Sequence, residues 1–338
     1  MKNCLCCGKP LPEQDEKSGT GWHQKCIRKF FGTEQLPELD LSPEALDQLA
    51  EETAQKHLTV PGVQKKLSLH LSRDESPRLT IVDAPAGYIL KPQTPRYTSL
   101  PEAEDCVMRM ADAAGIATVP HALLKFASAP AGQNDQDIYA FITRRIDRSF
   151  DPRPSRRSGK SVPKRPDLYA MEDFCQLSFR QTRDKYRGSY EKCAAVISRW
   201  SSLPGIDLAE FYYRLLFCFV TGNSDMHLKN FSLREKTSGK RDFVLSAAYD
   251  LLPVNIVLPE DKEETALTLH GKKRNLRKND FLAFADTSGI NSAAARRILG
   301  RIVSLEDRFH RICDASLMPA EMKESLHELM KIRFRRLL

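Results

Sequence analysis

The sequence has few cysteines and no long apolar run, and both absences limit the kind of protein it can be. Nine cysteines are scattered over 338 residues, far from the density of a disulfide-stapled secreted domain, so we expect a reducing, cytoplasmic compartment. The longest apolar stretches, such as residues 215–220, are much shorter than the roughly 20 residues needed to span a bilayer. The first residues also lack the apolar segment of a secretion signal. A cytoplasmic protein without a membrane-spanning helix is therefore predicted.

The bulk composition is that of a folded chain with an uneven positive charge. Hydrophobic residues make up 41% and charged residues 28% of the sequence, which is ordinary for globular proteins and allows two lobes with separate cores. The formal net charge is +8, and basic residues cluster between Arg144 and Arg165. Such a segment can attract phosphate-bearing partners, but it is also typical of a solvated surface loop. Both interpretations stay open at this point.

A period-two pattern marks the first half of the chain. Leu67, Leu69 and Leu71 alternate with polar residues, as expected for a strand with one buried face. Further strands are predicted near residues 79–82, 88–90, 119–126 and 137–146. One helix is predicted to begin at Ser42, and another to cover residues 101–114 and end at Gly115. This half is therefore predicted to be rich in strands.

The second half of the chain is predicted to be mainly helical. Apolar periodicity indicates helices near residues 170–179, 188–202, 207–221, 279–287, 291–315 and 319–337. A strand-rich lobe followed by a helix-rich lobe is an α+β, two-lobed plan. The predicted boundaries are residues 1–35 for a small Cys-rich module, 42–147 for the strand-rich lobe and 148–338 for the helical lobe.

Two short chelating pairs lie within the Cys-rich module. Cys4-x-x-Cys7 and His23-x-x-Cys26 can each bind one side of a tetrahedral ion, and four protein ligands are typical of structural zinc. Cys6 is a spare thiol that could substitute for one ligand. The other cysteines lie in apolar helical patterns and are predicted to be core residues: Cys106, Cys175, Cys193, Cys218 and Cys313. The sequence therefore predicts a zinc-ribbon-like module with a structural Zn²⁺.

The densest group of polar residues follows the apolar segment 211–220. Beyond Gly222, Asp225 and Asn230 have the D-x-x-x-x-N spacing of a protein-kinase catalytic loop. A carboxylate there can accept the proton of an attacking hydroxyl, while the amide oxygen binds magnesium on the phosphates. Asp250 follows a strand-like run and has the position of the second magnesium ligand. Each element alone is a weak signal, but the ordered pair favours phosphoryl transfer over a simple turn.

The first lobe offers the complementary nucleotide-binding groups. Lys91 ends a predicted strand and Glu104 lies on the next helix, the arrangement that holds a phosphate-binding lysine in kinases. The plainer interpretation is an exposed lysine and a glutamate favoured by the helix dipole. Upstream, backbone N–H groups of a segment with a single glycine could cover phosphates, although one glycine is less diagnostic than a glycine-rich motif. That segment contains Gly62, Val63, Gln64 and Lys65.

Together these motifs resemble the HipA-like kinases of bacterial toxin–antitoxin modules, and the most similar variety is the short HipT type, which also begins with a Cys-rich module. The resemblance extends from Leu58 to Ile332, and its most specific element is Asp225-x-His227-x-Lys229-Asn230-Phe231-Ser232. The other matching segments are residues 61–67, 88–92, 145–148 and 249–251. The resemblance implies a two-lobed, protein-kinase-like fold. It also implies a Ser/Thr kinase toxin that phosphorylates an aminoacyl-tRNA synthetase and so arrests translation and growth.

By matching position, the resemblance implies a role for each candidate residue. Asp225 would be the base, and Lys91, held by Glu104, would bind the ATP phosphates. Asn230 and Asp250 would be the Mg²⁺ ligands. The ATP-binding set would also include His227 and Lys229 and, as the adenine hinge, Thr143, Arg144, Arg145 and Ile146.

Two departures from the family pattern affect partners and regulation. Full-length HipA kinases carry a larger N-terminal subdomain, whereas a short Cys-rich module and one predicted helix precede the glycine segment here. We therefore expect a small separate subunit that supplies the subdomain, alongside a helix-turn-helix antitoxin through which DNA is contacted. The family often has serines for autophosphorylation just before the loop glycine. Here Pro61 fills the nearer position, which leaves Thr59 as the candidate phosphorylation site.

Two other functions remain open from the sequence. A zinc-containing nucleic-acid-binding protein would use the zinc module, the basic segment and a C-terminal helix with Lys331, Arg333, Arg335 and Arg336. That function would leave Asp225, Asn230 and Asp250 without a role. A kinase for a small molecule or a lipid headgroup also stays open, because the D-x-H-x-K-N loop departs from the H-R-D form of protein kinases. Salt-sensitive binding of a duplex would indicate the first, and phosphate transfer to a small molecule the second.

Overall fold

The computed structural model describes residues 2–39, 66–72, 76–81, 86–94, 96–125, 137–149 and 167–338. The chain divides into two compact units, one made of residues 1–105 with 119–168 and the other of residues 106–118 with 169–338. The predicted helix from Ser42, the glycine segment at Gly62 and most of the basic segment lie outside the described residues. Within the described part of the chain, no helix is both long and apolar enough to cross a membrane.

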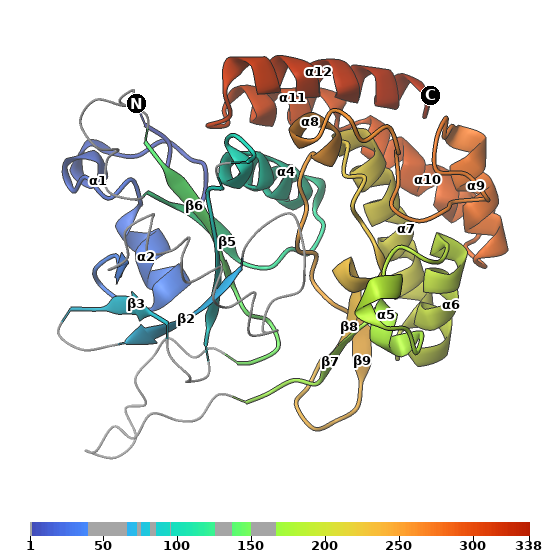
Figure 1. Cartoon of the computed structure of the whole chain (residues 1–338), viewed down its shortest axis with the longest axis horizontal. Coiled ribbons are helices and arrows are strands. Elements are labelled where there is room, and N and C mark those ends of the chain that lie inside the picture. Colours follow the sequence, from blue (N-terminus) through green and yellow to red (C-terminus); the bar gives the residue numbers. More distant parts are fainter. Residues whose placement is uncertain are drawn as a thin grey trace. The chain divides into compact units, whose positions relative to one another are not determined.

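The first unit is built on a six-stranded sheet with the strand order β1-β3-β2-β4-β6-β5 (Figure 1). Its strands are β1 (Glu38–Leu39), β2 (Leu67–Ser72), β3 (Arg78–Thr80), β4 (Tyr88–Pro92), β5 (His121–Lys125) and β6 (Tyr139–Arg144). All neighbours are antiparallel except β1 and β3. Leu67, Leu69 and Leu71 are buried while the residues between them are more exposed. The predicted one-sided strand is therefore confirmed.

The N-terminal residues are packed onto this sheet. They include two helices, α1 (Glu13–Lys17) and α2 (Gln24–Phe31), and the ring of Phe31 lies 5.4 Å from that of Tyr88 in β4. At the edge strand β5, the backbone N–H of Leu123 donates to the Leu5 carbonyl at 3.0 Å. The Leu123 carbonyl accepts from the indole Nε1 of Trp22 at 3.2 Å. The N-terminal segment therefore satisfies backbone groups that an uncovered edge strand would expose.

Helix α4 (Leu100–Ala114) follows the prediction closely. Its inward residues are fully buried, and Gly115 ends it with a φ of 78°, in the left-handed region that favours glycine. A side chain at residue 115 would meet Arg301, whose guanidinium donates to the Ala114 carbonyl at 2.7 Å. The glycine therefore leaves room for the Arg301 guanidinium to donate to the carbonyl of Ala114 at the end of the helix.

The second unit is organised around one apolar helix, α7 (Pro204–Thr221), which is contacted by α6, α10 and α12 (Figure 1). Phe211, Phe217 and Phe219 of α7 meet aromatic rings of other helices at centroid distances of 6.2, 5.6 and 5.1 Å. A helix buried on nearly all sides is predominantly apolar. The other helices of this unit are α5 (Phe174–Leu177), α6 (Tyr190–Trp200), α8 (Val254–Val257), α9 (Lys278–Thr287), α10 (Ser292–Val303), α11 (Glu306–Asp314) and α12 (Ala320–Arg335).

Two predicted helices differ in the structure. The predicted helix over residues 170–179 is instead the strand β7 (Met171–Asp173) followed by the short α5, because β7 pairs with β8 (Ser232–Glu235), which in turn pairs with β9 (Phe243–Leu245). Asp173 then caps α5 by accepting from the Gln176 N–H. The predicted helix over residues 291–315 is two helices, because Ser304 ends α10 with its hydroxyl on the Arg301 carbonyl.

Candidate active site

The candidate catalytic loop begins where α7 ends. Gly222 terminates the helix with a φ of 72°, and a Cβ on this residue would lie 3.0 Å from the Leu329 side chain of α12. The left-handed turn is combined with a close approach, so the position requires glycine. The next N–H, of Asn223, returns to the Cys218 carbonyl at 2.8 Å. A rigid, buried helix therefore fixes the start of the loop.

Within this loop the structure brings Asp225 and Asn230 together. The side-chain amide of Asn230 donates to the backbone carbonyl of Asp225 at 2.8 Å. The N–H of Asp225 in turn donates to the side-chain oxygen of Asn223 at 3.3 Å. Most of the loop is buried, but the Asp225 side chain retains 33% of its exposure. The loop therefore presents a carboxylate to solvent from a backbone held by two amide side chains.

Two aromatic side chains surround the Asp225 carboxylate. The hydroxyl of Tyr186 donates to Asp225 Oδ1 at 2.7 Å, and the Tyr186 ring meets the His227 ring edge-on at 5.0 Å. His227 Nε2 lies 4.0 Å from Asp225 Oδ2. Burial, and then the neighbouring Asp225 carboxylate, raise the pKa of Tyr186, so the phenol stays protonated. Sequence reasoning missed Tyr186, because nothing local connects two residues 39 positions apart.

Asp250, the second predicted magnesium ligand, has an unusual backbone conformation. Its φ is 56°, in the left-handed region that non-glycine residues rarely adopt. Its carbonyl accepts from the Asn223 side chain at 3.4 Å. The hydroxyl of the preceding Tyr249 donates to the Lys229 carbonyl at 3.2 Å. Asp250 is therefore tied to the candidate catalytic loop, and strained conformations of this kind cluster at functional sites.

Lys229 is engaged within its own unit. Its ammonium lies 2.7 Å from Asp173 Oδ2, and both side chains are largely buried. This ion pair connects the catalytic loop to the β7–α5 junction. Its predicted contact with the nucleotide stays a prediction, because a phosphate would have to compete with Asp173.

In the other unit the structure brings Lys91 and Glu104 together. Both side chains are buried, with 4% and 0% exposure, and they form an ion pair. The Lys91 ammonium also lies 5.5 Å above the Phe141 ring. Taking both charges out of water is costly, so a buried pair is weak evidence for stability. In kinases, a lysine paired with a glutamate in this way binds the phosphates of the nucleotide.

The predicted adenine hinge follows β6. The backbone N–H groups of Arg144 and Arg145 donate to the carbonyls of Pro120 and Gly87, each at 2.9 Å. An adenine would therefore have to use other backbone groups of this stretch, where Thr143 is buried and Ile146 is partly exposed.

A carboxylate fixes the chain just beyond the hinge. Asp147 accepts hydrogen bonds from the guanidinium groups of Arg145 and Arg148. Although burial alone would raise it, these bonds hold the pKa of Asp147 well below its usual range. Two of the arginines predicted to attract phosphate are therefore already bonded to an internal carboxylate.

The predicted zinc ligands converge. One ligand atom from each of Cys4, Cys7, His23 and Cys26 lies within 4.8 Å of all the others. His23 Nε2 is 3.0 Å from the Pro10 carbonyl, which leaves Nδ1 as the metal-binding nitrogen, the usual arrangement for a ligating histidine. Burial and the neighbouring thiols raise the pKa of Cys26, so ionised thiols here require a cation. The set fits Zn²⁺ by its three sulfurs and one nitrogen.

The described residues include neither the predicted glycine segment, Gly62, Val63, Gln64 and Lys65, nor the predicted phosphorylation site, Thr59.

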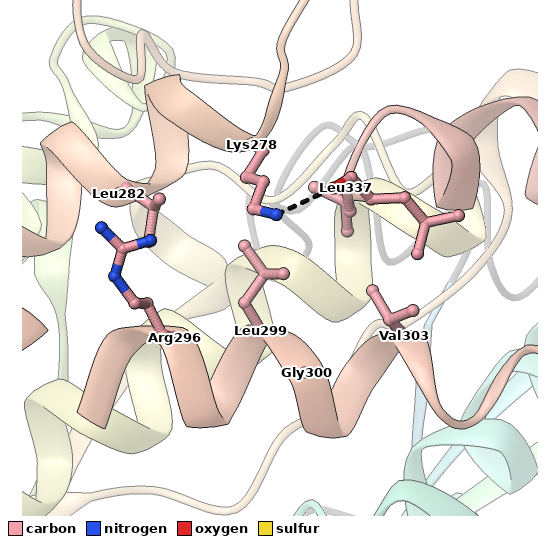
Figure 2. Close-up of a pocket in the computed structure, with 8 residues that line it drawn as sticks. Lys278, Leu282, Arg296, Leu299, Gly300, Val303 and Leu337 are labelled. Carbon is pink, nitrogen blue, oxygen red and sulfur yellow. Dashed lines mark hydrogen bonds between the residues drawn. The ribbon is translucent and has the colours of Figure 1, made fainter. Parts of the chain in front are cut away.

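A cavity of about 290 Å³ between α9, α10 and the C-terminal residues is lined by Leu282, Leu299, Val303 and Leu337 among others (Figure 2). Lys278 donates to the Leu338 carbonyl beside it at 2.8 Å. This mainly apolar cavity contains none of the candidate residues.

This chain is similar to known proteins over most of its length. The family model for the HipA-like C-terminal domain matches residues 58–308. A provisionally named kinase from Haemophilus influenzae is 25% identical over 94% of this chain and 92% of its own length. The provisionally named kinase Y4mE from Sinorhizobium fredii is 28% identical over 74% of this chain, which spans 54% of that protein.

Solved structures share the fold. HipA of Shewanella oneidensis, determined with HipB and operator DNA, has a TM-score of 0.63 at 20% identity and covers 96% of this chain and 83% of its own. The Helicobacter pylori proinflammatory kinase CtkA has a TM-score of 0.50 at 16% identity, over 77% of this chain and 87% of its own. The α+β fold with a strand-rich and a helical part, predicted from the sequence, is confirmed by these neighbours.

Proposed function

Because this chain belongs to the family of HipA-like C-terminal domains, we propose that it is an ATP- and magnesium-dependent protein kinase acting on serine or threonine. The observation that best supports the proposal is the loop after α7. There, the Asp225 carboxylate is partly exposed, and the side-chain amide of Asn230 donates to the backbone carbonyl of Asp225. A kinase needs a base beside a magnesium-binding amide at this spacing.

The proposed roles divide between the two units. In the helical unit, Asp225 accepts the proton of the acceptor hydroxyl, and the side-chain oxygens of Asn230 and Asp250 bind Mg²⁺. In the sheet unit, Lys91, held by Glu104, binds the phosphates, and residues 143–146 and 62–65 contact the rest of ATP. Bound Mg²⁺ would neutralise charge on the phosphates.

A structural Zn²⁺ is proposed at Cys4, Cys7, His23 and Cys26. Its role is to fix the N-terminal turns that carry Leu5 and Trp22, the residues bonded to strand β5. With four protein ligands and no open position, the ion would supply stability and no catalysis.

The biological role proposed is that of a toxin in a toxin–antitoxin module, with an aminoacyl-tRNA synthetase as the phosphorylated protein. Support comes from the family and from the Shewanella HipA, which was solved with HipB and operator DNA. By analogy, this chain would bind a helix-turn-helix antitoxin and a small additional subunit. Growth arrest on expression, relieved by proteins encoded beside it, would support this role.

Two basic residues that the nucleic-acid alternative would use make contacts inside the helical unit. Arg333 is 7% exposed and its guanidinium lies 4.6 Å above the Phe219 ring. Arg336 is 2.5 Å from Glu264. Two of the four basic residues of the C-terminal helix are therefore occupied within the unit rather than displayed for phosphate.

Incubation with γ-labelled ATP, Mg²⁺ and a cell lysate tests the proposed function. We expect one or a few proteins to be labelled on serine or threonine, and no labelling with Asp225→Asn. Label confined to a small molecule would instead indicate a small-molecule kinase. Absence of any label transfer would contradict the proposed function.

A further inference from the structure

The two oxygens of the candidate base have different neighbours. Asp225 Oδ1 accepts a hydrogen bond from the Tyr186 hydroxyl at 2.7 Å. Oδ2 lies 4.0 Å from His227 Nε2, longer than a hydrogen bond. Oδ1 is therefore bonded to a phenol, and the imidazole of His227 lies on the side of Oδ2.

Tyr186 is held in this position by its surroundings. The N–H of Leu228, in the catalytic loop, donates to the carbonyl of the adjoining Lys185 at 3.1 Å. The Tyr186 ring packs edge-on against the buried His227 at 5.0 Å. The N–H of Lys229 donates to His227 Nδ1 at 3.3 Å, so neutral His227 carries its proton on Nε2. Tyr186 is therefore fixed to the same loop as the carboxylate it contacts.

We propose that Tyr186 is a positioning residue for the base: its hydroxyl fixes the Asp225 carboxylate through Oδ1 and directs Oδ2 to the acceptor hydroxyl. This inference rests on the proposed function, because it assigns a role relative to Asp225 as base. It follows the general pattern in which a catalytic base is oriented by a third group. In this role Tyr186 acts through Asp225 and is assigned no contact of its own with the nucleotide or the reacting atoms.

The proton and bond changes are those of simple phosphoryl transfer. The acceptor oxygen forms a bond to the γ-phosphorus, and the bond from that phosphorus to the β–γ bridging oxygen breaks. The acceptor proton passes to Asp225 Oδ2, and ADP leaves with the bridging electron pair. Tyr186 keeps its proton throughout, because burial and the adjacent carboxylate raise the pKa of its phenol.

If the contact between Tyr186 and Asp225 had a different role, Tyr186→Phe would change the rate in the opposite direction. If the phenol occupied the place of the acceptor hydroxyl, it would block the base, and removing it would accelerate transfer. The bond from the loop to the Lys185 carbonyl and the contact of the Tyr186 ring with His227 favour orientation over blocking, since a blocking group has to leave. The sign of the rate change in Tyr186→Phe distinguishes the two.

Tyr186→Phe removes only the hydroxyl and keeps the ring against His227. We expect kcat to fall roughly 10- to 100-fold, because the charged base loses a hydrogen-bond donor. The KM for ATP should stay unchanged. The acidic limb of the pH profile should move to higher pH, because the ionised base has lost a donor. Tyr139→Phe is the matched control, since it removes a 3.3 Å tyrosine–carboxylate bond to Asp137 outside the candidate site.

The rate is measured as ADP formation from Mg–ATP with casein as a generic seryl acceptor, for wild type, Tyr186→Phe, Asp225→Asn and the double variant. Within the Asp225→Asn background, Tyr186→Phe should cause no further loss. Carbon-13 NMR titration of the Asp225 carboxyl, assigned with Asp225→Asn, gives a readout independent of activity. Its midpoint should be higher in Tyr186→Phe than in wild type.

The outcomes distinguish failure of the proposed function from failure of the positioning role of Tyr186. An inactive wild type or a fully active Asp225→Asn contradicts the proposed function, and the NMR titration then still decides whether Tyr186 bonds the carboxylate. An inactive Asp225→Asn combined with an unchanged or faster Tyr186→Phe overturns the positioning role alone. A slower Tyr186→Phe whose pH profile and carboxyl midpoint match wild type also overturns it, because a merely structural defect leaves both unmoved.

Discussion

The buried ion pair between Lys91 and Glu104 allows stability and function to be separated. The two side chains are 4% and 0% exposed, so Lys91→Met leaves a glutamate charge in the interior without its ammonium partner. Breaking a buried pair from one side typically costs about 3–5 kcal/mol, whereas replacing both members by apolar residues is often neutral. We therefore expect Lys91→Met to lower the free energy of unfolding by about 3–5 kcal/mol. Most of this should return in Lys91→Met combined with Glu104→Leu.

Activity should not follow stability across this series. The double variant regains most of its free energy of unfolding but has no ammonium for the phosphates. Its ADP formation should therefore stay at the level of the single variant. Urea unfolding at pH 7 and ADP formation from Mg–ATP measure the two quantities on the same samples. Recovery of activity together with stability would refute the functional role of the pair. A single variant within 1 kcal/mol of wild type, on the order of an exposed ion pair, would refute the energetic reasoning.

Three further predictions concern metal, pH and modification. Purified protein should contain one zinc per chain, and Cys7→Ser should release it and lower the melting temperature of the sheet unit, because the zinc turns carry Leu5 and Trp22 onto β5; zinc-free wild-type protein of equal stability would contradict this. Burial, opposed by a backbone hydrogen bond and aided by Asp105, raises the pKa of Glu102 to about 7 from 4.5. The stability that depends on protonated Glu102 is therefore fully present below pH 4.5 and lost as pH rises through 7. Between pH 5 and 8, the free energy of unfolding of Glu102→Gln should gain roughly 2–3 kcal/mol over that of wild type in urea unfolding, and equal pH dependence in both would refute it. Long incubation with Mg–ATP should phosphorylate Thr59 slowly, and Thr59→Asp should reduce activity; mass spectrometry showing an unmodified Thr59, with a fully active Thr59→Asp, would contradict it.

Local patterns predicted those parts of the fold that are stabilised locally. The alternation of Leu67, Leu69 and Leu71 identifies β2, since one face of that strand is buried. The apolar run of α7 and the glycine at residue 115 likewise match their helix and helix end. By contrast, residues 171–173 form a strand only because they pair with residues 232–234, more than fifty positions away. No local period reports such a partner.

The candidate site was predictable from the sequence only where its residues are close together in the chain. Asp225 and Asn230 are close in sequence, and the structure bonds the Asn230 amide to the Asp225 carbonyl. Tyr186 was not predictable, because its contact with Asp225 depends on how a distant loop packs. Arg333, one of the basic residues that the nucleic-acid alternative would use, stacks on Phe219. Sequence patterns identify charged residues but not the partners that the tertiary fold gives them.

The central claim is that Asp225 is the base of a phosphoryl-transfer reaction. The most direct test compares ADP formation and ATP binding in wild type, Asp225→Asn and the control Asp242→Asn, whose side chain bonds the Thr237 N–H in the β8–β9 turn. We predict that Asp225→Asn reduces the rate roughly 10²- to 10⁴-fold, the usual contribution of a general base, with a nearly unchanged Kd for Mg–ATP, while Asp242→Asn behaves as wild type. A rate for Asp225→Asn within a few-fold of wild type would contradict the account.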